Sequence, residues 1–88
     1  MVEGKLSNGF EYKIEEENLD NYETLEKLWD IDENPENSYL IRDVIIDILG
    51  KGQYDELKAF IKKQDGRISS SKMFSLLGEI LDIDKVKN

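Results

Sequence analysis

The stretch Gly4–Ile14, which reads GKLSNGFEYKI, decides the fold of this chain. Two short segments in which apolar and polar residues alternate flank a Ser-Asn-Gly turn. Asn-Gly between such segments predicts a β-hairpin, because both residues tolerate positive φ. We therefore predict antiparallel strands over residues 2–6 and 10–15.

The two predicted strands share one apolar face. Phe10, Tyr12 and Ile14 lie on the same side of the second strand, and the first strand adds Val2 and Leu6. A lone two-stranded hairpin is only marginally stable in water. The hairpin must therefore pack this face on helices, or pair an edge with another chain.

Four helices are predicted after the hairpin, from apolar residues that recur at helical spacing. The predicted bounds are 20–29, 37–49, 53–63 and 69–81. The last three have apolar stripes at Leu40, Ile41, Val44, Ile45, Ile48 and Leu49; at Tyr54, Leu57, Phe60 and Ile61; and at Met73, Leu76, Leu77, Ile80 and Leu81. The expected fold class is α+β, mainly α. It is a single domain over 1–88, with a hairpin at 2–15, a helical bundle at 20–82 and a frayed tail at 83–88.

The first predicted helix begins with Asp20 and Glu23 at the spacing of a capping box. Its predicted buried stripe is Tyr22, Leu25, Leu28 and Trp29, and Glu23 and Lys27 are expected to pair at i,i+4. Pro35 should end this helix by Asn34, because the residue before proline avoids the helical region.

The second predicted helix is the most apolar, and we expect it to be the central one. Asn37 or Ser38 is its expected N-cap, and Gly50 is expected to end it as a left-handed cap. The β-branched run Val44–Ile46 is also compatible with a strand, but the helical period and the cap residues favour a helix.

The composition narrows the classes of function. The chain has neither cysteine nor histidine, which excludes disulfides, thiolate metal sites and the commonest general base. Its formal net charge is −8, which disfavours contact with nucleic acid and with anionic membranes. No segment approaches the length of a membrane span, and the N-terminus has no signal-peptide pattern. A cytoplasmic protein is expected.

No motif predicts a catalytic, cofactor or metal site. Asp30-x-Asp32-x-Asn34 lacks the glycine and the glutamate of a calcium loop. Residues 65–69 resemble the middle of such a loop, but its first, third and twelfth positions would be Ile61, Lys63 and Lys72, none of which is a useful ligand. Gly50-Lys51-Gly52 lacks the Ser or Thr of a phosphate loop and follows a helix. The acidic run Glu15–Glu17 with Asp20 is expected to be a solvated strand end and helical turn.

Three aromatic residues are candidates for contact with a partner: Trp29, Tyr39 and Phe74. The helical spacing of Trp29 favours a place in the core. Tyr39 beside the Pro35 linker is the better interface candidate, and Phe74 lies at the margin of its helix stripe.

Several stretches together resemble a known family. They are GFEYKI at 9–14, LWDIDENP at 28–35, the Leu49-Gly50 helix end, QYDELK at 53–58 and DGRI at 65–68. The chain resembles the small tail assembly chaperones of long-tailed bacteriophages and prophages over nearly its whole length.

This resemblance implies a non-enzymatic protein that binds the tape-measure protein, keeps that long chain soluble and helps recruit tail-tube subunits. It would act in the bacterial host cytoplasm and be absent from the mature virion. It implies no cofactor, and an exposed hairpin edge would allow a homo-oligomer to form. The alternatives are a small phage structural or head–tail joining component, or a regulator that binds a host protein.

Overall fold

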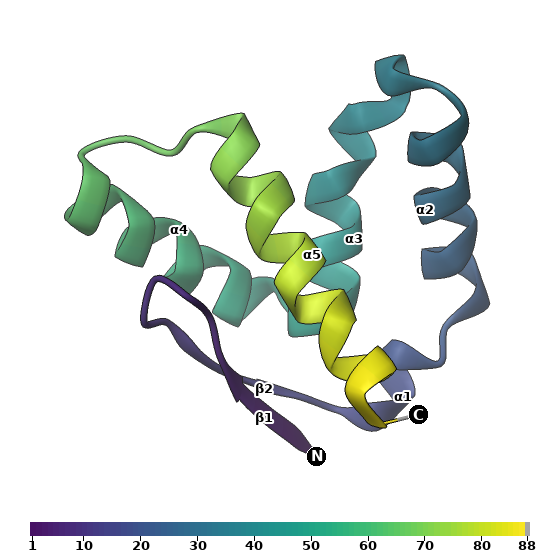
Figure 1. Ribbon diagram of the computed structural model, residues 1–88, viewed down its shortest axis with the longest axis horizontal. Coiled ribbons are helices and arrows are strands. Elements are labelled where there is room, and N and C mark those ends of the chain that lie inside the picture. Colours follow the sequence, from purple (N-terminus) through teal and green to yellow (C-terminus); the bar gives the residue numbers. More distant parts are fainter. Residues whose placement is uncertain (88) are drawn as a thin grey trace.

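The computed structural model describes the backbone of residues 1–87 and the side chains of residues 1–81 (Figure 1). Strands β1 (Val2–Lys5) and β2 (Glu11–Ile14) form an antiparallel hairpin. Helices α1 (Glu16–Leu19), α2 (Tyr22–Glu33), α3 (Ile41–Leu49), α4 (Lys51–Asp65) and α5 (Ser70–Lys87) follow, with a 3₁₀ helix, η1 (Pro35–Leu40), between α2 and α3. The predicted mainly helical α+β fold is confirmed, and α2–α5 correspond to the four predicted helices.

The hairpin turn lies where the Ser-Asn-Gly sequence predicted it. The Leu6 N–H donates to the Phe10 carbonyl at 2.8 Å, so the loop consists of Ser7, Asn8 and Gly9. Gly9 alone has positive φ, at 99°, and no non-glycine residue of the described chain does. This is the pattern of a type I turn followed by a glycine bulge, the commonest three-residue hairpin loop. Asn8 contributes its side-chain oxygen, which accepts from the Phe10 N–H at 3.0 Å.

The hairpin face is buried against the helices, as the alternation predicted. Val2 pairs with Ile14, and the apolar side chains of both strands lie inside the molecule. The Phe10 ring meets Phe60 of α4 edge to face, with ring centroids 5.6 Å apart. The turn is also bound to α5, because the Ser7 N–H and Oγ–H donate to the Glu79 carboxylate at 2.7 and 2.6 Å.

Helix α3 is the central element. It contacts α2, α4, α5 and β2 (Figure 1). The buried apolar core draws on the hairpin, α3, α4 and α5. Its members are Val2, Leu6, Phe10, Tyr12, Ile14, Val44, Ile45, Ile48, Leu49, Tyr54, Leu57, Ile61, Met73, Leu76, Leu77 and Ile80. The predicted stripes of the last three helices therefore face the core, with Leu40, Ile41, Phe60 and Leu81 half-buried at its border.

Gly50 joins α3 to α4 without a loop. Its N–H donates to Ile46 at 2.7 Å, which completes α3, and its carbonyl accepts from Tyr54 at 3.0 Å, which begins α4. Its φ of 86° and ψ of 155° belong to a region that is essentially restricted to glycine. The predicted helix end is confirmed, but Gly50 is extended rather than left-handed helical. The left-handed cap occurs instead at Gly66, after α4.

Helix α2 corrects three predictions. Its N-cap is Asn21 rather than Asp20, because the Asn21 side chain accepts from the Glu23 and Thr24 N–H groups. It continues beyond the predicted end at Trp29 to Glu33, although it stops before Pro35 as predicted. Its buried face holds Thr24, with Leu28 half-buried, whereas Tyr22, Leu25 and Trp29 of the predicted stripe are exposed.

Lys27 pairs across the α2–α3 boundary instead of with Glu23. Its Nζ lies 2.7 Å from Asp47 Oδ2, which also accepts from the Thr24 hydroxyl at 3.0 Å. The hydrogen bond from Lys27 to Asp47, with the surrounding carboxylates, raises the pKa of Lys27. A polar contact thus fixes the side of α2 that faces the core.

The remaining boundaries shift by a few residues. The expected cap of the second helix, Asn37 or Ser38, lies inside η1, which Asn34 caps by accepting from the Glu36 N–H. Glu16 and Glu17 begin α1, so the acidic run forms an exposed helical turn, although not that of the helix predicted at 20. The α5 backbone is helical to Lys87, beyond the predicted end at 81; Asn88 and the side chains from 82 onward lie outside the described residues.

Candidate interaction surfaces

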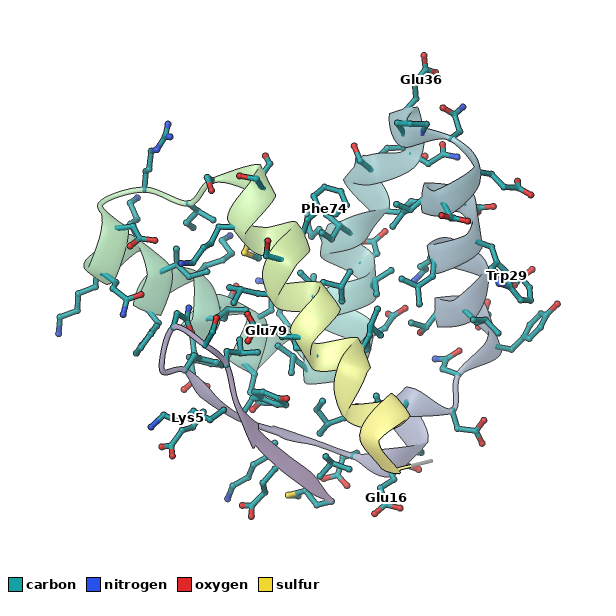
Figure 2. All side chains as sticks on the ribbon, in the orientation of Figure 1. Lys5, Glu16, Trp29, Glu36, Phe74 and Glu79 are labelled. Carbon is teal, nitrogen blue, oxygen red and sulfur yellow. The ribbon has the colours of Figure 1, made fainter. Side chains whose placement is uncertain are left out.

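The three aromatic residues singled out from the sequence are exposed but lie in two separate places. Tyr39 is 70% exposed, Trp29 50% and Phe74 39%. Tyr39 and Phe74 line one groove, whereas Trp29 lies on the outer side of α2, away from α3 and α5 (Figure 2). The expectation that Trp29 belongs to the core is wrong.

The groove lies between η1 with the first turns of α3 and the start of α5. Figure 2 shows Phe74 projecting from α5 toward α3. The groove has a volume of about 340 Å³. Its lining residues are Glu36, Ser38, Tyr39, Ile41, Arg42, Ile45, Tyr54, Ile68, Ser69, Ser70, Met73 and Phe74.

Buried core residues form the base of the groove, and the aromatic rings of Tyr39 and Phe74 form its margins. Ile45, Tyr54 and Met73 line it and are each at most 9% exposed, so they are held by the packing of three helices. Tyr39 and Phe74 expose much more of their rings. An apolar side chain entering the groove would meet a preformed apolar surface and would cover aromatic area that now faces water.

Local capping fixes the two aromatic residues. Pro35 occupies the first position of η1, where its fixed φ suits a helical start, and the Asn37 side chain donates to the Asp30 carbonyl at 2.9 Å. At the other margin, the Ser69 hydroxyl accepts from the Lys72 N–H at 3.1 Å at the start of α5. Tyr39 therefore lies in a short, capped 3₁₀ helix, and Phe74 lies near the capped start of α5.

The rim of the groove carries one charge of each sign. Glu36 and Arg42 are both exposed, and neither forms an ion pair among the described side chains. An occupant with mixed charge beside its apolar face would be held in one orientation. The groove is thus suited to recognising a polypeptide segment through apolar anchors and flanking charges.

The sequence singled out Tyr39 and Phe74 at the margins of this groove, but not the other residues that line it. Arg42 and Ile68 were not singled out, and Ile45, Tyr54 and Met73 were expected only as core. Ile68, in the polar connection between α4 and α5, was the available signal, because an isolated apolar residue in such a connection often packs against a neighbouring element.

One edge of the hairpin is covered by a side chain. The Lys13 N–H donates to Gln53 Oε1 at 2.8 Å, and Gln53 Nε2 donates to the Lys13 carbonyl at 2.6 Å. The Gln53 amide therefore takes the position of a neighbouring strand on β2. The predicted pairing of a hairpin edge with another chain would have to use β1 or displace Gln53.

The loop motifs set aside in the sequence lie within regular elements. Asp30 and Asp32 belong to α2, and Asn34 caps η1, so they do not form a calcium loop. Lys51 and Gly52 begin α4. Within residues 1–81, no group of three or more acidic side chains is placed to hold a metal ion.

Comparison with known proteins gave no match to a family model, a curated protein or a solved structure. None of the helices in the described part of the chain combines the length and the apolar character needed to cross a bilayer.

Proposed function

We propose that this chain is a tail assembly chaperone of a long-tailed phage or prophage, which binds the tape-measure protein and catalyses no reaction. The proposal rests on the resemblance of the stretches GFEYKI, LWDIDENP, QYDELK and DGRI to that family. The observation that favours a binding role is the open groove margined by Tyr39 and Phe74 over a buried apolar base.

A groove of this kind suits one face of an amphipathic helix. Such helices insert apolar residues one turn apart into a hydrophobic groove, and large aromatic residues at the margins supply much of the binding energy. A tape-measure protein is a long helical chain whose apolar stripes aggregate when unpaired. Covering one stripe at a time would keep it soluble until tail-tube subunits replace the chaperone.

The proposal includes a place of action. The protein would work in the host cytoplasm while the tail is assembled and would leave before the virion is complete. Tail-tube protein is a second proposed partner. Nucleic acid and membranes are not, because the net charge of −8 repels both phosphate backbones and anionic headgroups.

Co-purification with the tape-measure protein encoded in the same genome tests the proposal. The wild-type chain should retain that protein, and the double variant Tyr39→Ser, Phe74→Ser should lose most of it. The matched control is Tyr22→Ser, Trp29→Ser, which removes a similar aromatic area from α2 and should retain the partner. Equal retention by all three forms would contradict a role for the groove.

Mass spectrometry of purified virions separates this function from the alternatives. An assembly chaperone should be present in infected cells and missing from purified particles. A fixed stoichiometric amount in the particle would instead identify a structural or head–tail joining component. Retention of a host protein, with no tail protein retained, would identify a regulator.

A further inference from the structure

Helix α2 carries a second apolar surface, which faces solvent between Tyr22 and Trp29. Tyr22, Leu25 and Trp29 are 65%, 41% and 50% exposed. Their spacing of three and four residues places them on one side of the helix. The Tyr22 and Trp29 rings meet edge to face with centroids 6.0 Å apart, so the two aromatic residues form one continuous patch. We call these three residues the α2 stripe.

The α2 stripe lies opposite the face that binds the core. Thr24 is buried, and Thr24 and Lys27 both bond to Asp47 of α3, which fixes the rotation of α2. Figure 2 shows Trp29 projecting away from α3 and α5. Rotation of α2 therefore cannot bury the stripe without breaking the contacts to Asp47.

Carboxylates border the stripe along one side and at both ends. Helical spacing places Glu26 and Asp30 along that side, with Glu23 near the first end and Asp32 and Glu33 beyond Trp29 at the other. All five are exposed, and none forms an ion pair among the side chains that the structure describes. The only cation of α2, Lys27, is paired with Asp47. An apolar stripe with acidic borders selects its partner by charge.

We infer that the α2 stripe is a docking site for a basic amphipathic helix, with aliphatic residues along one face and Lys or Arg beside them. The aliphatic face would cover Trp29 and Leu25, and the cations would meet the bordering carboxylates. A second copy of this chain is a poorer occupant, because α2 against α2 would oppose carboxylate to carboxylate. This surface is separate from the groove, and the inference does not depend on the phage assignment.

The chain has a built-in reporter for this interaction. Trp29 is its only tryptophan and is half exposed, so burial by a partner should shift its emission to shorter wavelength. The probe is a synthetic 18-residue helix of Leu and Lys with all leucines on one face. Two matched peptides serve as controls: one with Glu in place of every Lys, and one of identical composition with the leucines scattered around the helix.

The Leu-Lys peptide should shift the emission and bind more weakly as salt is raised. Leu25→Ser and the double variant Glu26→Lys, Asp30→Lys should each weaken binding by about tenfold or more, the equivalent of about 1.4 kcal/mol. The charge-matched control Glu11→Lys, Glu56→Lys changes exposed carboxylates on β2 and α4 and should bind the peptide like the wild type. Far-ultraviolet circular dichroism of each variant checks that the helices remain folded.

Several results would overturn the inference. They are an unchanged emission with the Leu-Lys peptide, equal binding of either control peptide, or equal binding by the variants. Self-association in sedimentation experiments that Leu25→Ser abolishes would identify a second copy as the occupant instead. A negative result with the peptides would not contradict the proposed role of the groove, because the tape-measure experiment depends on Tyr39 and Phe74.

Discussion

At the scale of single residues, Gly9 determines whether the hairpin turn can form. Its φ of 99° is unfavourable for any residue with a side chain. A Cβ at this position would lie 3.7 Å from the Phe60 ring, which is an ordinary contact, so the cost of a substitution is conformational rather than steric.

Gly9→Ala should lower the free energy of unfolding by about 1–2 kcal/mol, the cost of a left-handed backbone for an L residue. Gly78→Ala is the matched control, because Gly78 lies within α5 with open space around its Cβ position. That substitution should raise stability by about 0.5–1 kcal/mol through helix propensity. Urea unfolding of both variants measures the difference, and equal effects would contradict the role given to Gly9.

The Lys27–Asp47 contact makes the free energy of unfolding depend on pH in the alkaline range. The bond to Asp47 raises the pKa of Lys27 above its ordinary value of 10.5. The folded protein therefore keeps a proton that the unfolded chain loses. The stabilisation is complete below pH 10.5 and is lost as pH rises through the folded-state pKa.

Ionisation of Tyr12 also lowers the free energy of unfolding as the pH rises. Burial, aided by the nearby Glu79, raises the pKa of its phenol above 10.0. We expect the free energy of unfolding to decrease from pH 9 to 11.5 in the wild type and to decrease less steeply in Lys27→Met and in Tyr12→Phe. Urea unfolding at several pH values measures the slopes, and identical slopes in all three forms would be inconsistent with this account.

At the scale of elements, Gln53 couples the hairpin to α4. Its amide binds both backbone groups of Lys13 and also donates to the Leu49 carbonyl at 2.7 Å. The outer edge of β2 is thereby held against the helices and shielded from other strands.

Gln53→Ala should release this edge. Hydrogen exchange at the Lys13 amide should become faster, because its acceptor is gone, whereas the Leu6 amide, bonded within the hairpin to Phe10, should keep its protection. Exchange measured by NMR distinguishes the two sites. Unchanged exchange at Lys13 would show that the amide is protected by something other than Gln53.

Comparison of α2 with α4 shows what the sequence can predict about an element. Helix α4 has a single apolar stripe, so the burial of Tyr54, Leu57 and Ile61 followed from their spacing. Helix α2 has apolar residues on two sides, and the more prominent set, including Trp29, faces water. Which side of α2 is buried depends on its contacts with Asp47, twenty residues beyond Lys27. Such tertiary contacts are not visible in local periodicity.

The same limit applies to the candidate site. Tyr39 and Phe74 could be selected singly, because Tyr39 flanks the Pro35 linker and Phe74 lies at the margin of its helix stripe. Their meeting at one groove depends on how η1 and α5 pack around α3, which helical spacing does not determine. The hairpin loop was predicted at the correct residues, Ser7 to Gly9, but only Gly9 uses the positive φ that both Asn8 and Gly9 tolerate.

At the scale of the whole molecule, one small core supports two open surfaces. Leu57 is fully buried where α4 meets the other elements. Leu57→Ala should lower the free energy of unfolding by about 2–5 kcal/mol, a large part of the 5–15 kcal/mol typical of small domains. Tyr39→Ser should change it by no more than about 0.5 kcal/mol, because this side chain is 70% exposed. Phe74→Ser should lower it by about 1–2 kcal/mol, because Phe74 is 39% exposed and loses the part of its ring that is buried. Thermal and urea unfolding test this contrast; a large loss in the groove variants would assign their aromatic rings to stability rather than binding.

The soluble fraction of the tape-measure protein, co-expressed with either the wild-type chain or the Tyr39→Ser, Phe74→Ser variant, tests the central claim most directly. We predict that the wild type keeps most of that protein in solution and that the variant, although folded, leaves it in the pellet. A tape-measure protein that stays equally soluble with both forms, or insoluble with both, would contradict the claim that this groove holds it.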